Sequence, residues 1–369
     1  MQIQSIEAIP LAASFVNMFK FGTIDRSKSP NVLLVIRSDE GHTGYGEAVP
    51  VPAFTSETQT SIVELVDTRI APALLGRDPL DRLPLLTDVS RVLRLAPFTV
   101  AALDIALVDL TGKALGVPAS QLFGGAYRTT IPVHGSVGWD EEPAKMVDLA
   151  VEQARTYPSL KLYAGRGEID ADLDRLQAVR DAVGGDIELF VDVNTMWEPS
   201  EFARALDRAG EIGLRGFEQP LLPAAAGIQK QLMAGRSVDI IADEAVRSVP
   251  DAAQVAASGT ATVLNIGLQK VGGPTAALQS AQVAAAHGIG VHVGAVLELG
   301  VGTAAGLHLA AALPKLSYPS YLMGPLKYAQ RITTEQIEII DGAIAVPQGP
   351  GLGVEIDEDQ IQALDLRRR

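Results

Sequence analysis

Three acidic residues at regular spacing carry the clearest chemical signal in the chain. Asp192, Glu218 and Asp243 lie 26 and then 25 residues apart, and each follows a short apolar run. One strand–helix unit of a parallel sheet is about that long, so the spacing predicts that the three carboxylates meet at one rim. Converging carboxylates repel one another unless a cation lies between them, and an all-oxygen set suits Mg²⁺, or else Mn²⁺. The alternative is that each acid only caps the helix that follows it.

Two lysines and a tyrosine accompany these acids. Lys270 lies 27 residues beyond Asp243, while Lys161 and Tyr163 alternate on an earlier strand and therefore share one face. Strands two and six of an eight-stranded barrel are opposite each other, so amines would flank a carboxylate held by the metal. That arrangement suits removal of the proton next to a carboxylate. Lys270 is the predicted base, because a phenol with a pKa of about 10 is a weaker base than a desolvated lysine. A solvated loop charge is the alternative for each lysine.

The elements that would position these residues begin near residue 130, where short apolar runs alternate with helical segments. The runs are 131–137, 159–163, 187–193, 213–218, 239–243, 262–267 and 290–293, with a weaker eighth at 318–323. About eight such units predict an α/β fold with a closed (β/α)7β TIM-like barrel, whose active site lies at the carboxyl ends of the strands. An open doubly wound sheet is the alternative, but no glycine-rich dinucleotide fingerprint follows the early strands.

The segment before the barrel has the pattern of a separate α+β capping domain. Its strand-like segments predict a β-meander, and its apolar residues then recur at helical spacing. The expected strands are 3–14, 31–37 and 43–49, and the expected helices are 57–72, 80–95 and 98–115. Residues 15–30 are expected to form a loop, which is too long for a hairpin.

The carboxyl-terminal residues predict a return to this capping domain. Residues 337–346 contain two apolar runs around Asp341-Gly342, the pattern of a hairpin, which we expect to join the amino-terminal sheet. We therefore expect a capping domain at 1–125, a catalytic barrel at 126–330, and a segment at 331–369 that completes the capping domain.

Composition excludes several classes of partner. The chain has a net charge of −14, no cysteine and 47% hydrophobic residues. The negative charge disfavours nucleic acid and anionic membranes, and the absence of cysteine excludes disulfides and thiolate chemistry. The uncharged stretch 271–297 contains Gly, Pro, Gln and His, so it predicts a buried helix and strand rather than a membrane span. No signal peptide is visible at the amino terminus, so we expect a cytoplasmic protein.

Several stretches together resemble the enolase superfamily and, within it, the muconate lactonizing enzyme subgroup. These stretches are spread over nearly the whole chain. In the amino-terminal part they are residues 102–110 with Lys113 and 116–118, followed by 121–125. In the barrel and the tail they are 191–194, 217–220, 242–244, 265–273, and Pro347 with 349–353. The resemblance implies a Mg²⁺-dependent isomerase or lyase that takes the α-proton from a small carboxylate substrate through a metal-stabilised enediolate. It also implies a homo-oligomer.

The chain departs from the subgroup at one catalytic position. Muconate lactonizing enzymes carry Lys-x-Lys on strand two, whereas this chain has Lys161-Leu162-Tyr163. The mandelate racemase pattern is also absent, since strand six carries Asn265 and Gly267, and His292 is expected to be a core residue. A one-base reaction, cycloisomerisation or dehydration, is therefore the leading hypothesis. The alternatives are a racemase or epimerase that uses Lys270 with the strand-two groups, and a catalytically silent binding protein.

Substrate binding is expected to involve loops of the capping domain and two polar residues at the barrel rim. The loops 15–22 and 49–55 contain Phe19, Phe21 and Phe54, which suggest a partly apolar lid or, alternatively, ordinary packing between domains. Asn194 and Glu298 are the polar candidates, and helix capping is the alternative for Glu298. No Asp-x-Asp motif follows strand eight at 321–325, which argues against a dipeptide epimerase.

Overall fold

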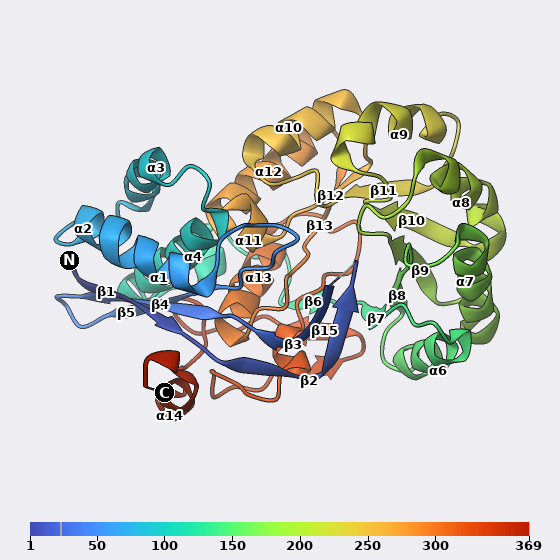
Figure 1. The fold of residues 1–369 in the computed structure, drawn as a ribbon. Helices are drawn as coiled ribbons and strands as arrows, with labels where there is room; N and C mark the ends of the chain where they lie inside the picture. The colour runs from blue at the N-terminus through green and yellow to red at the C-terminus, as the bar shows by residue number, and fades with distance from the viewer. Residues whose placement is uncertain (23, 369) are drawn as a thin grey trace.

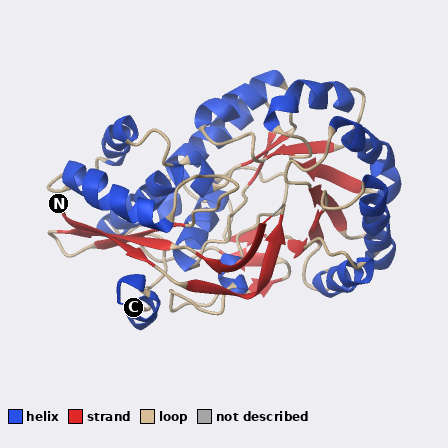
Figure 2. Cartoon of the chain, in the orientation of Figure 1, coloured by secondary structure: helices blue, strands red, loops and turns tan. Residues whose placement is uncertain are grey.

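A computed structural model describes residues 1–22 and 24–368. A strand-rich amino-terminal part lies beside a parallel sheet wrapped by helices (Figures 1 and 2). Within the described residues no helix is long and apolar enough to cross a membrane.

The amino-terminal part contains an antiparallel sheet in the order β1-β4-β5, made of β1 (Ile3–Pro10), β4 (Val32–Ser38) and β5 (Thr43–Ala48). The long buried helix α4 (Pro97–Leu115) packs directly on β5. Two glycines permit this close approach, because a Cβ at Gly46 would lie 1.9 Å from the Ala102 carbonyl oxygen and one at Gly44 would lie 2.3 Å from that of Ala106.

The expected helices of this part are confirmed, with small differences at their ends. The first consists of α1 (Gln59–Leu65), a π-helical turn (Val66–Ile70) and α2 (Ala71–Leu74), and the others are α3 (Arg82–Val92), α4 and the short α5 (Ala119–Leu122). Helix α4 ends at Gly116, whose φ of 69° is a left-handed conformation that glycine adopts without strain.

The loop expected at 15–30 is wrong. The chain forms an antiparallel ribbon there, β2 (Ala13–Phe21) and β3 (Ile24–Ser29), and the expected strand at 3–14 is divided after Pro10. The register shifts between Ser14 and Phe19, so β2 contains an irregularity that lengthens it relative to β3. Ala13 and Phe15 of β2 pack into the core, but β3 (IDRSKS) carries almost no apolar residues, so a search for alternating hydrophobic residues does not find the ribbon.

Seven strands form the parallel sheet, in sequence order from β7 to β13. They are β7 (Gly135–Val137), β8 (Ser159–Tyr163), β9 (Glu188–Asp192), β10 (Leu214–Glu218), β11 (Asp239–Ala242), β12 (Val263–Asn265) and β13 (Gly290–His292). Helices cover its outer side: α6 (Pro143–Gln153), α7 (Ile169–Val183), α8 (Pro199–Ile212), α9 (Ala226–Met233), α10 (Val249–Ser258), α12 (Pro274–Ala286) and α13 (Gly300–Ala312) (Figure 2). The short helix α11 (Leu268–Val271) is buried and packs against α4. This confirms the strand–helix alternation and the interpretation of 271–297 as helix and strand.

The eighth run closes the sheet without forming a regular strand. The backbone N–H groups of Ser317 and Tyr321 donate to the carbonyls of Val291 and Val293 on the β13 side, at 2.7 and 3.1 Å. On the other side, Ser320 N–H donates to Pro132 O at 2.8 Å, next to β7. The segment 317–321 thus bridges the first and last strands, as a (β/α)7β barrel requires.

The carboxyl-terminal hairpin exists, but its expected partner is wrong. Strands β14 (Ile339–Ile340) and β15 (Ala343–Ala345) pair with each other, and β15 pairs with β6 (Thr130–Pro132) rather than with the β1-β4-β5 sheet. Burial of Ile344 against the barrel core favours this position. The return to the amino-terminal part comes later, through α14 (Glu358–Leu364), where Ala12 N–H donates to Leu364 O at 2.9 Å. Short 3-10 turns at Pro223–Ala225, Gly324–Lys327 and Leu366–Arg368 complete the fold.

A buried acid from the amino-terminal part caps a helix of the barrel. Glu47 of β5 accepts hydrogen bonds from the N–H groups of Leu299 and Gly302, at 2.7 and 2.8 Å, at the start of α13. A third bond comes from Asn31 Nδ2 at 2.7 Å. Asp104 of α4 likewise accepts from Thr275 N–H at 2.6 Å in the first turn of α12. These caps fix the orientation of the two parts around the barrel mouth.

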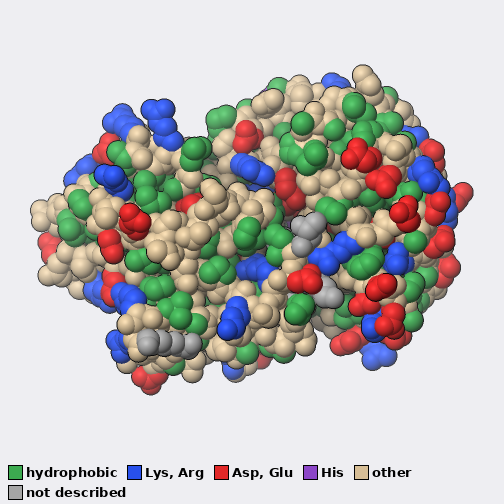
Figure 3. Space-filling model, in the orientation of Figure 1, with side chains coloured by type: hydrophobic (Ala, Val, Ile, Leu, Met, Phe, Trp, Pro, Cys, Tyr) green, Lys and Arg blue, Asp and Glu red, His purple; other side chains and the backbone are tan. Residues whose placement is uncertain are grey.

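Charge is distributed unevenly over the face that Figure 3 shows, where acidic side chains gather toward the edge formed by α7 and α8. Lysine and arginine stand among them, so the described residues of this face form no continuous basic stripe of the kind that nucleic acid requires.

Candidate active site

A cavity lies at the carboxyl ends of the barrel strands, under the ribbon β2–β3 and the loop after β5. Most of the predicted site residues line it, namely Phe54, Lys161, Tyr163, Asp192, Asn194, Glu218, Asp243, Lys270 and Glu298. Val51 of the predicted loop 49–55 lines it too, and so do residues that the sequence did not point to, among them Arg26, Gln269 and Tyr321.

The strand register brings the predicted metal ligands side by side. Tyr163 of β8 pairs with Asp192 of β9, and Asp192 pairs with Glu218 of β10. Asp243 follows β11, the next strand along. Neighbouring parallel strands therefore present these side chains at one rim, as the spacing in the sequence predicts.

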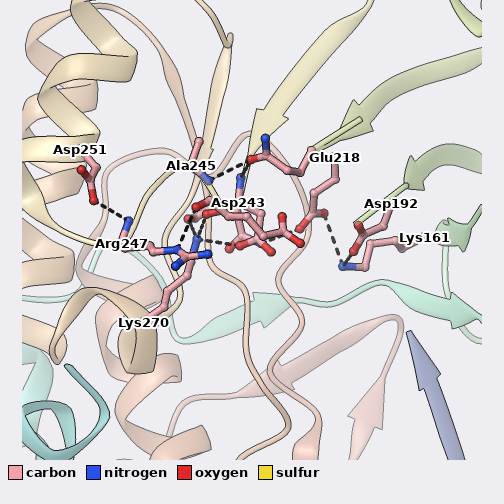
Figure 4. Close-up of polar contacts among 11 residues, drawn as sticks. Lys161, Asp192, Glu218, Asp243, Ala245, Arg247, Asp251 and Lys270 are labelled. Carbon is pink, nitrogen blue, oxygen red and sulfur yellow. Dashed lines mark hydrogen bonds and ion pairs between the residues drawn. The ribbon is translucent and has the colours of Figure 1, made fainter. Parts of the chain in front are cut away.

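Lys161 lies between two of the acids. Its Nζ is 2.8 Å from Asp192 Oδ2 and 3.4 Å from Glu218 Oε2 (Figure 4). Burial alone would lower the pKa of Lys161, but the charges of Asp192 and Glu218 reverse this and hold it well above the usual value. Burial also raises the pKa of Glu218 to about 8; the charge of Lys161 opposes this rise, and the charges of Asp192 and Asp243 add to it. Lys161 is therefore an ammonium ion in this arrangement.

Lys270 lies on the other side of the acids and comes from the short helix α11, one turn beyond the end of β12 (Figure 4). Its Nζ is 2.6 Å from Asp243 Oδ1, and it donates to the carbonyls of Asp243 and Asn265 at 2.6 and 2.8 Å. An ammonium has three N–H donors, so all three have an oxygen partner.

Tyr163 is buried above Lys161, whose Nζ lies 5.3 Å from the centre of the phenol ring. Burial raises the pKa of Tyr163 well above its usual value, against the opposing charge of Lys161. The phenol therefore keeps its proton near neutral pH and holds it at Oη.

The donor set has the chemistry of a divalent cation site, although its oxygens now contact lysines. As the side chains stand, no group of three or more acidic or histidine residues in the described chain is arranged to ligate a metal. Two buried acceptor oxygens next to the acids, Glu244 Oε2 and Asn265 Oδ1, have no donor among the described residues. The carboxyl groups of Asp192, Glu218 and Asp243 and these two oxygens together offer more acceptors than the two lysines have N–H donors. An all-oxygen set of this kind fits a divalent cation once the lysines move off Asp192 and Asp243.

The backbone is left-handed at Asn194, two residues after Asp192, and at Gln219, directly after Glu218, with φ of 47° and 36°. Asn194 N–H donates to Asp192 Oδ1 at 3.1 Å. Gln219 Oε1 accepts from the N–H groups of Asp243 and Ala245, both at 3.0 Å. These contacts orient the acids, and Asn was a recognisable signal because it tolerates positive φ.

The remaining predicted site residues differ in how they lie. Phe54 lines the cavity and packs with Val51 and Tyr163. The side chains of Phe19 and Phe21 lie outside the described part of the structure. Glu298 lines the cavity, and burial followed by the charge of Glu47 raises its pKa to about 8. The capping alternative for Glu298 loses its basis, since Glu47 supplies the side-chain cap of α13.

Two further aromatic or imidazole side chains, His292 and Tyr321, are also buried, but they lie in different surroundings. His292 is fully buried against Phe190 and Tyr318, which confirms it as a core residue. Tyr321 lines the cavity and lies in the eighth apolar run, where the sequence pattern considered above, Asp-x-Asp, concerns acidic residues alone.

The family comparison agrees with this geometry. Residues 11–124 match the model of the mandelate racemase/muconate lactonizing enzyme N-terminal domain, and residues 145–360 match that of the enolase C-terminal domain-like family. Muconate cycloisomerase 1 of Rhodococcus opacus is 32% identical over 98% of both chains. N-succinyl-L-Arg/Lys racemase of Bacillus cereus is 30% identical over 99% of this chain and 98% of its own.

The solved structures give the same result. Muconate lactonizing enzyme from Pseudomonas fluorescens, complexed with muconolactone, superimposes with a TM-score of 0.94 over 99% of both chains at 32% identity. The Bacillus cereus racemase superimposes with the same TM-score at 30% identity, over 99% of this chain and 98% of that one. The chain therefore belongs to the mandelate racemase/muconate lactonizing enzyme family of the enolase superfamily.

Proposed function

We propose that the protein is a Mg²⁺-dependent cycloisomerase that interconverts an unsaturated dicarboxylate of the muconate type and its lactone. One observation carries the proposal: three carboxyl groups on adjacent strands share a cavity with two lysines and a protonated phenol. The similarity to muconate cycloisomerases and to a muconolactone complex supports the substrate class.

Asp192, Glu218 and Asp243 would hold the metal. When bound, the ion supplies positive charge that stabilises the enediolate form of a substrate carboxylate. Lys161 adds a second positive charge on the β8 side, because Asp192 and Glu218 keep it protonated.

Ring closure requires one proton. One carboxylate oxygen adds to the conjugated double bond, the other carboxylate becomes an enediolate, and its α-carbon then takes up a proton. In the reverse direction the same group removes that proton. One acid–base residue is therefore sufficient, and a second base, at the position where Tyr163 stands, is not required.

Lys270 is the proposed acid–base residue, and Tyr163 is a hydrogen-bond donor to the substrate on the opposite side of the cavity. Lys270 holds its proton between Asp243 and the Asn265 carbonyl, so delivery requires it to give up one of its three oxygen partners. Tyr163 orients the substrate from the other face and has a proton to donate, because burial keeps the phenol neutral.

Turnover of cis,cis-muconate, followed by the loss of its diene absorbance, tests the proposal. We expect Mg²⁺-dependent conversion to a lactone, with one solvent deuterium at the α-carbon when the reaction runs in D₂O. Stable absorbance for muconate and its chlorinated forms, at saturating Mg²⁺, would exclude this function.

A racemase is the second candidate, and it is favoured by the placement of Tyr163 on β8 and of Lys270 after β12, with three strands between them in the sheet. The Bacillus cereus relative supports N-succinyl amino acids as its substrates. Exchange of the α-proton of N-succinyl-L-arginine with inversion would identify this activity, whereas exchange without inversion would exclude it.

The division into 1–125, 126–330 and 331–369, a cytoplasmic location and a homo-oligomeric state also form part of the proposal. The family resemblance supports the oligomer, and light scattering on the purified protein tests it directly.

A further inference from the structure

One buried phenol in the cavity lacks a hydrogen-bond partner. Tyr321 is 3% exposed and lines the cavity, and among the described residues its hydroxyl has no donor or acceptor beside it. Burying a hydroxyl without a partner opposes folding. Neighbouring buried tyrosines avoid this, because Tyr318 donates to Asp239 at 3.0 Å and Tyr328 donates to the Leu297 carbonyl at 2.6 Å.

The ring of Tyr321 is held firmly on several sides. It stacks on His134 with ring centres 5.0 Å apart and an angle of 9° between the planes. Its backbone N–H is tied to Val293 O at 3.1 Å in the segment that closes the barrel. The hydroxyl is therefore fixed within the cavity and cannot turn away to find another partner.

Lys161 lies between this phenol and Tyr163. Its Nζ is 5.5 Å from the centre of the Tyr321 ring and 5.3 Å from that of Tyr163. Two phenols, one from the same strand as Lys161 and one from the segment that closes the barrel, thus lie near one ammonium. A hydroxyl donor beside a fixed positive charge suits an anionic oxygen ligand, above all a carboxylate.

We propose that Tyr321 is a substrate-binding residue whose hydroxyl donates a hydrogen bond to a carboxylate oxygen of the ligand. The proposal rests on the proposed function for the presence of a carboxylate ligand in this cavity. It assigns the missing partner of Tyr321 to the substrate, so that the unpaired hydroxyl of the free protein is satisfied on binding.

Tyr321→Phe tests this, because it removes the hydroxyl and keeps the ring that stacks on His134. The probe is adipate, a saturated six-carbon dicarboxylate that cannot form a lactone, titrated into the Mg²⁺-loaded protein by calorimetry. We expect wild-type binding that depends on Mg²⁺, and adipate affinity at least about ten-fold weaker in Tyr321→Phe. The melting temperature of the free variant should not fall, since no existing hydrogen bond is lost.

Tyr318→Phe is the matched control from the same segment. It removes a hydroxyl that already has a partner, Asp239, so we expect a lower melting temperature and unchanged adipate affinity. Unchanged adipate affinity in Tyr321→Phe would overturn the proposal, and so would a failure of the wild type to bind adipate. Muconate turnover reports on the proposed function separately, because it can persist when the adipate result is negative.

Discussion

Asn194, two residues after Asp192, accepts a hydrogen bond through Oδ1 from the backbone N–H of Gly22 at 2.9 Å. Gly22 lies at the tip of the ribbon β2–β3, so a residue beside the predicted metal ligand holds the cover of the cavity in place. Arg166 adds two hydrogen bonds to the same ribbon. Its Nε donates to the Gly22 carbonyl, and its Nη2 donates to Asp25 Oδ1 at 3.1 Å.

Loss of the hydrogen bond between Gly22 and Asn194 should make the ribbon β2–β3 more mobile. Asn194→Gly keeps the left-handed backbone but removes the acceptor, so we expect faster amide hydrogen exchange in residues 13–22 and a KM raised about five-fold. Asn194→Asp retains an acceptor oxygen and serves as the control. Unchanged exchange in Asn194→Gly would show that the ribbon is held by other contacts.

Mg²⁺ binding, and with it turnover, should depend on Asp192, Glu218 and Asp243. Glu218→Gln removes one of the negative charges that attract the ion, so we expect loss of Mg²⁺ binding and of turnover with the circular dichroism spectrum retained. Calorimetric titration with Mg²⁺ measures the first effect. Full activity of the wild type in excess chelator would contradict the assignment.

Lys270 and Tyr163 should affect α-proton exchange differently. Lys270→Ala should stop turnover and exchange together, a loss beyond the roughly 10²–10⁴-fold typical of a general acid–base residue. Tyr163→Phe should reduce turnover and leave exchange measurable by NMR in D₂O. The opposite pattern, with exchange retained in Lys270→Ala and lost in Tyr163→Phe, would move the acid–base role to strand β8.

Glu298 should make stability depend on pH. Burial raises the pKa of Glu298 from 4.5 to about 8, so the folded protein holds a proton that the unfolded chain releases. Stability from this group is therefore full below pH 4.5 and is lost as the pH rises to about 8. Glu298→Gln should flatten that part of the profile of melting temperature against pH.

The exposed Glu211, in a surface pair with Arg208, provides the control for this measurement. Glu211→Gln should leave the profile unchanged. A Glu298→Gln profile that parallels the wild type would mean that the carboxyl is ionised in the folded protein.

Removal of the Glu47 carboxylate, which caps α13, should lower the free energy of unfolding. Glu47→Ala leaves the N–H groups of Leu299 and Gly302 and the amide of Asn31 without their acceptor, so we expect a loss of about 3 kcal/mol in the free energy of unfolding. Urea denaturation measures this. Glu7 of β1 is half-buried and forms surface ion pairs with Arg37 and Arg367, which contribute little. Glu7→Ala should therefore cost less, and an equal loss there would argue against a specific role of the cap.

The sequence predicts those parts of the site that depend on local periodicity. The spacing of Asp192, Glu218 and Asp243 equals the length of a strand–helix unit, and alternation along one strand places Lys161 and Tyr163 on one face. The structure confirms both relations between neighbouring strands.

Contacts between distant segments were not predictable in this way. Glu47 and Leu299 are 252 residues apart, and no local pattern links a strand acid with the start of a remote helix. The ribbon β2–β3 and the pairing of β15 with β6 likewise depend on which edges meet in the folded chain. Tyr321 was missed because an unpaired hydroxyl is a property of its surroundings and not of its residue type.

The caps from Glu47 and Asp104 also bear on how the chain can be divided. Each acid stands in the amino-terminal part and satisfies backbone N–H groups of a barrel helix. A barrel fragment made alone would leave those N–H groups without acceptors, and in an amino-terminal fragment the two carboxylates would keep Asn31 and Arg82 but lose the barrel N–H donors. The two pieces, expressed as separate polypeptides, should therefore be insoluble singly and should reassemble into one particle when produced together.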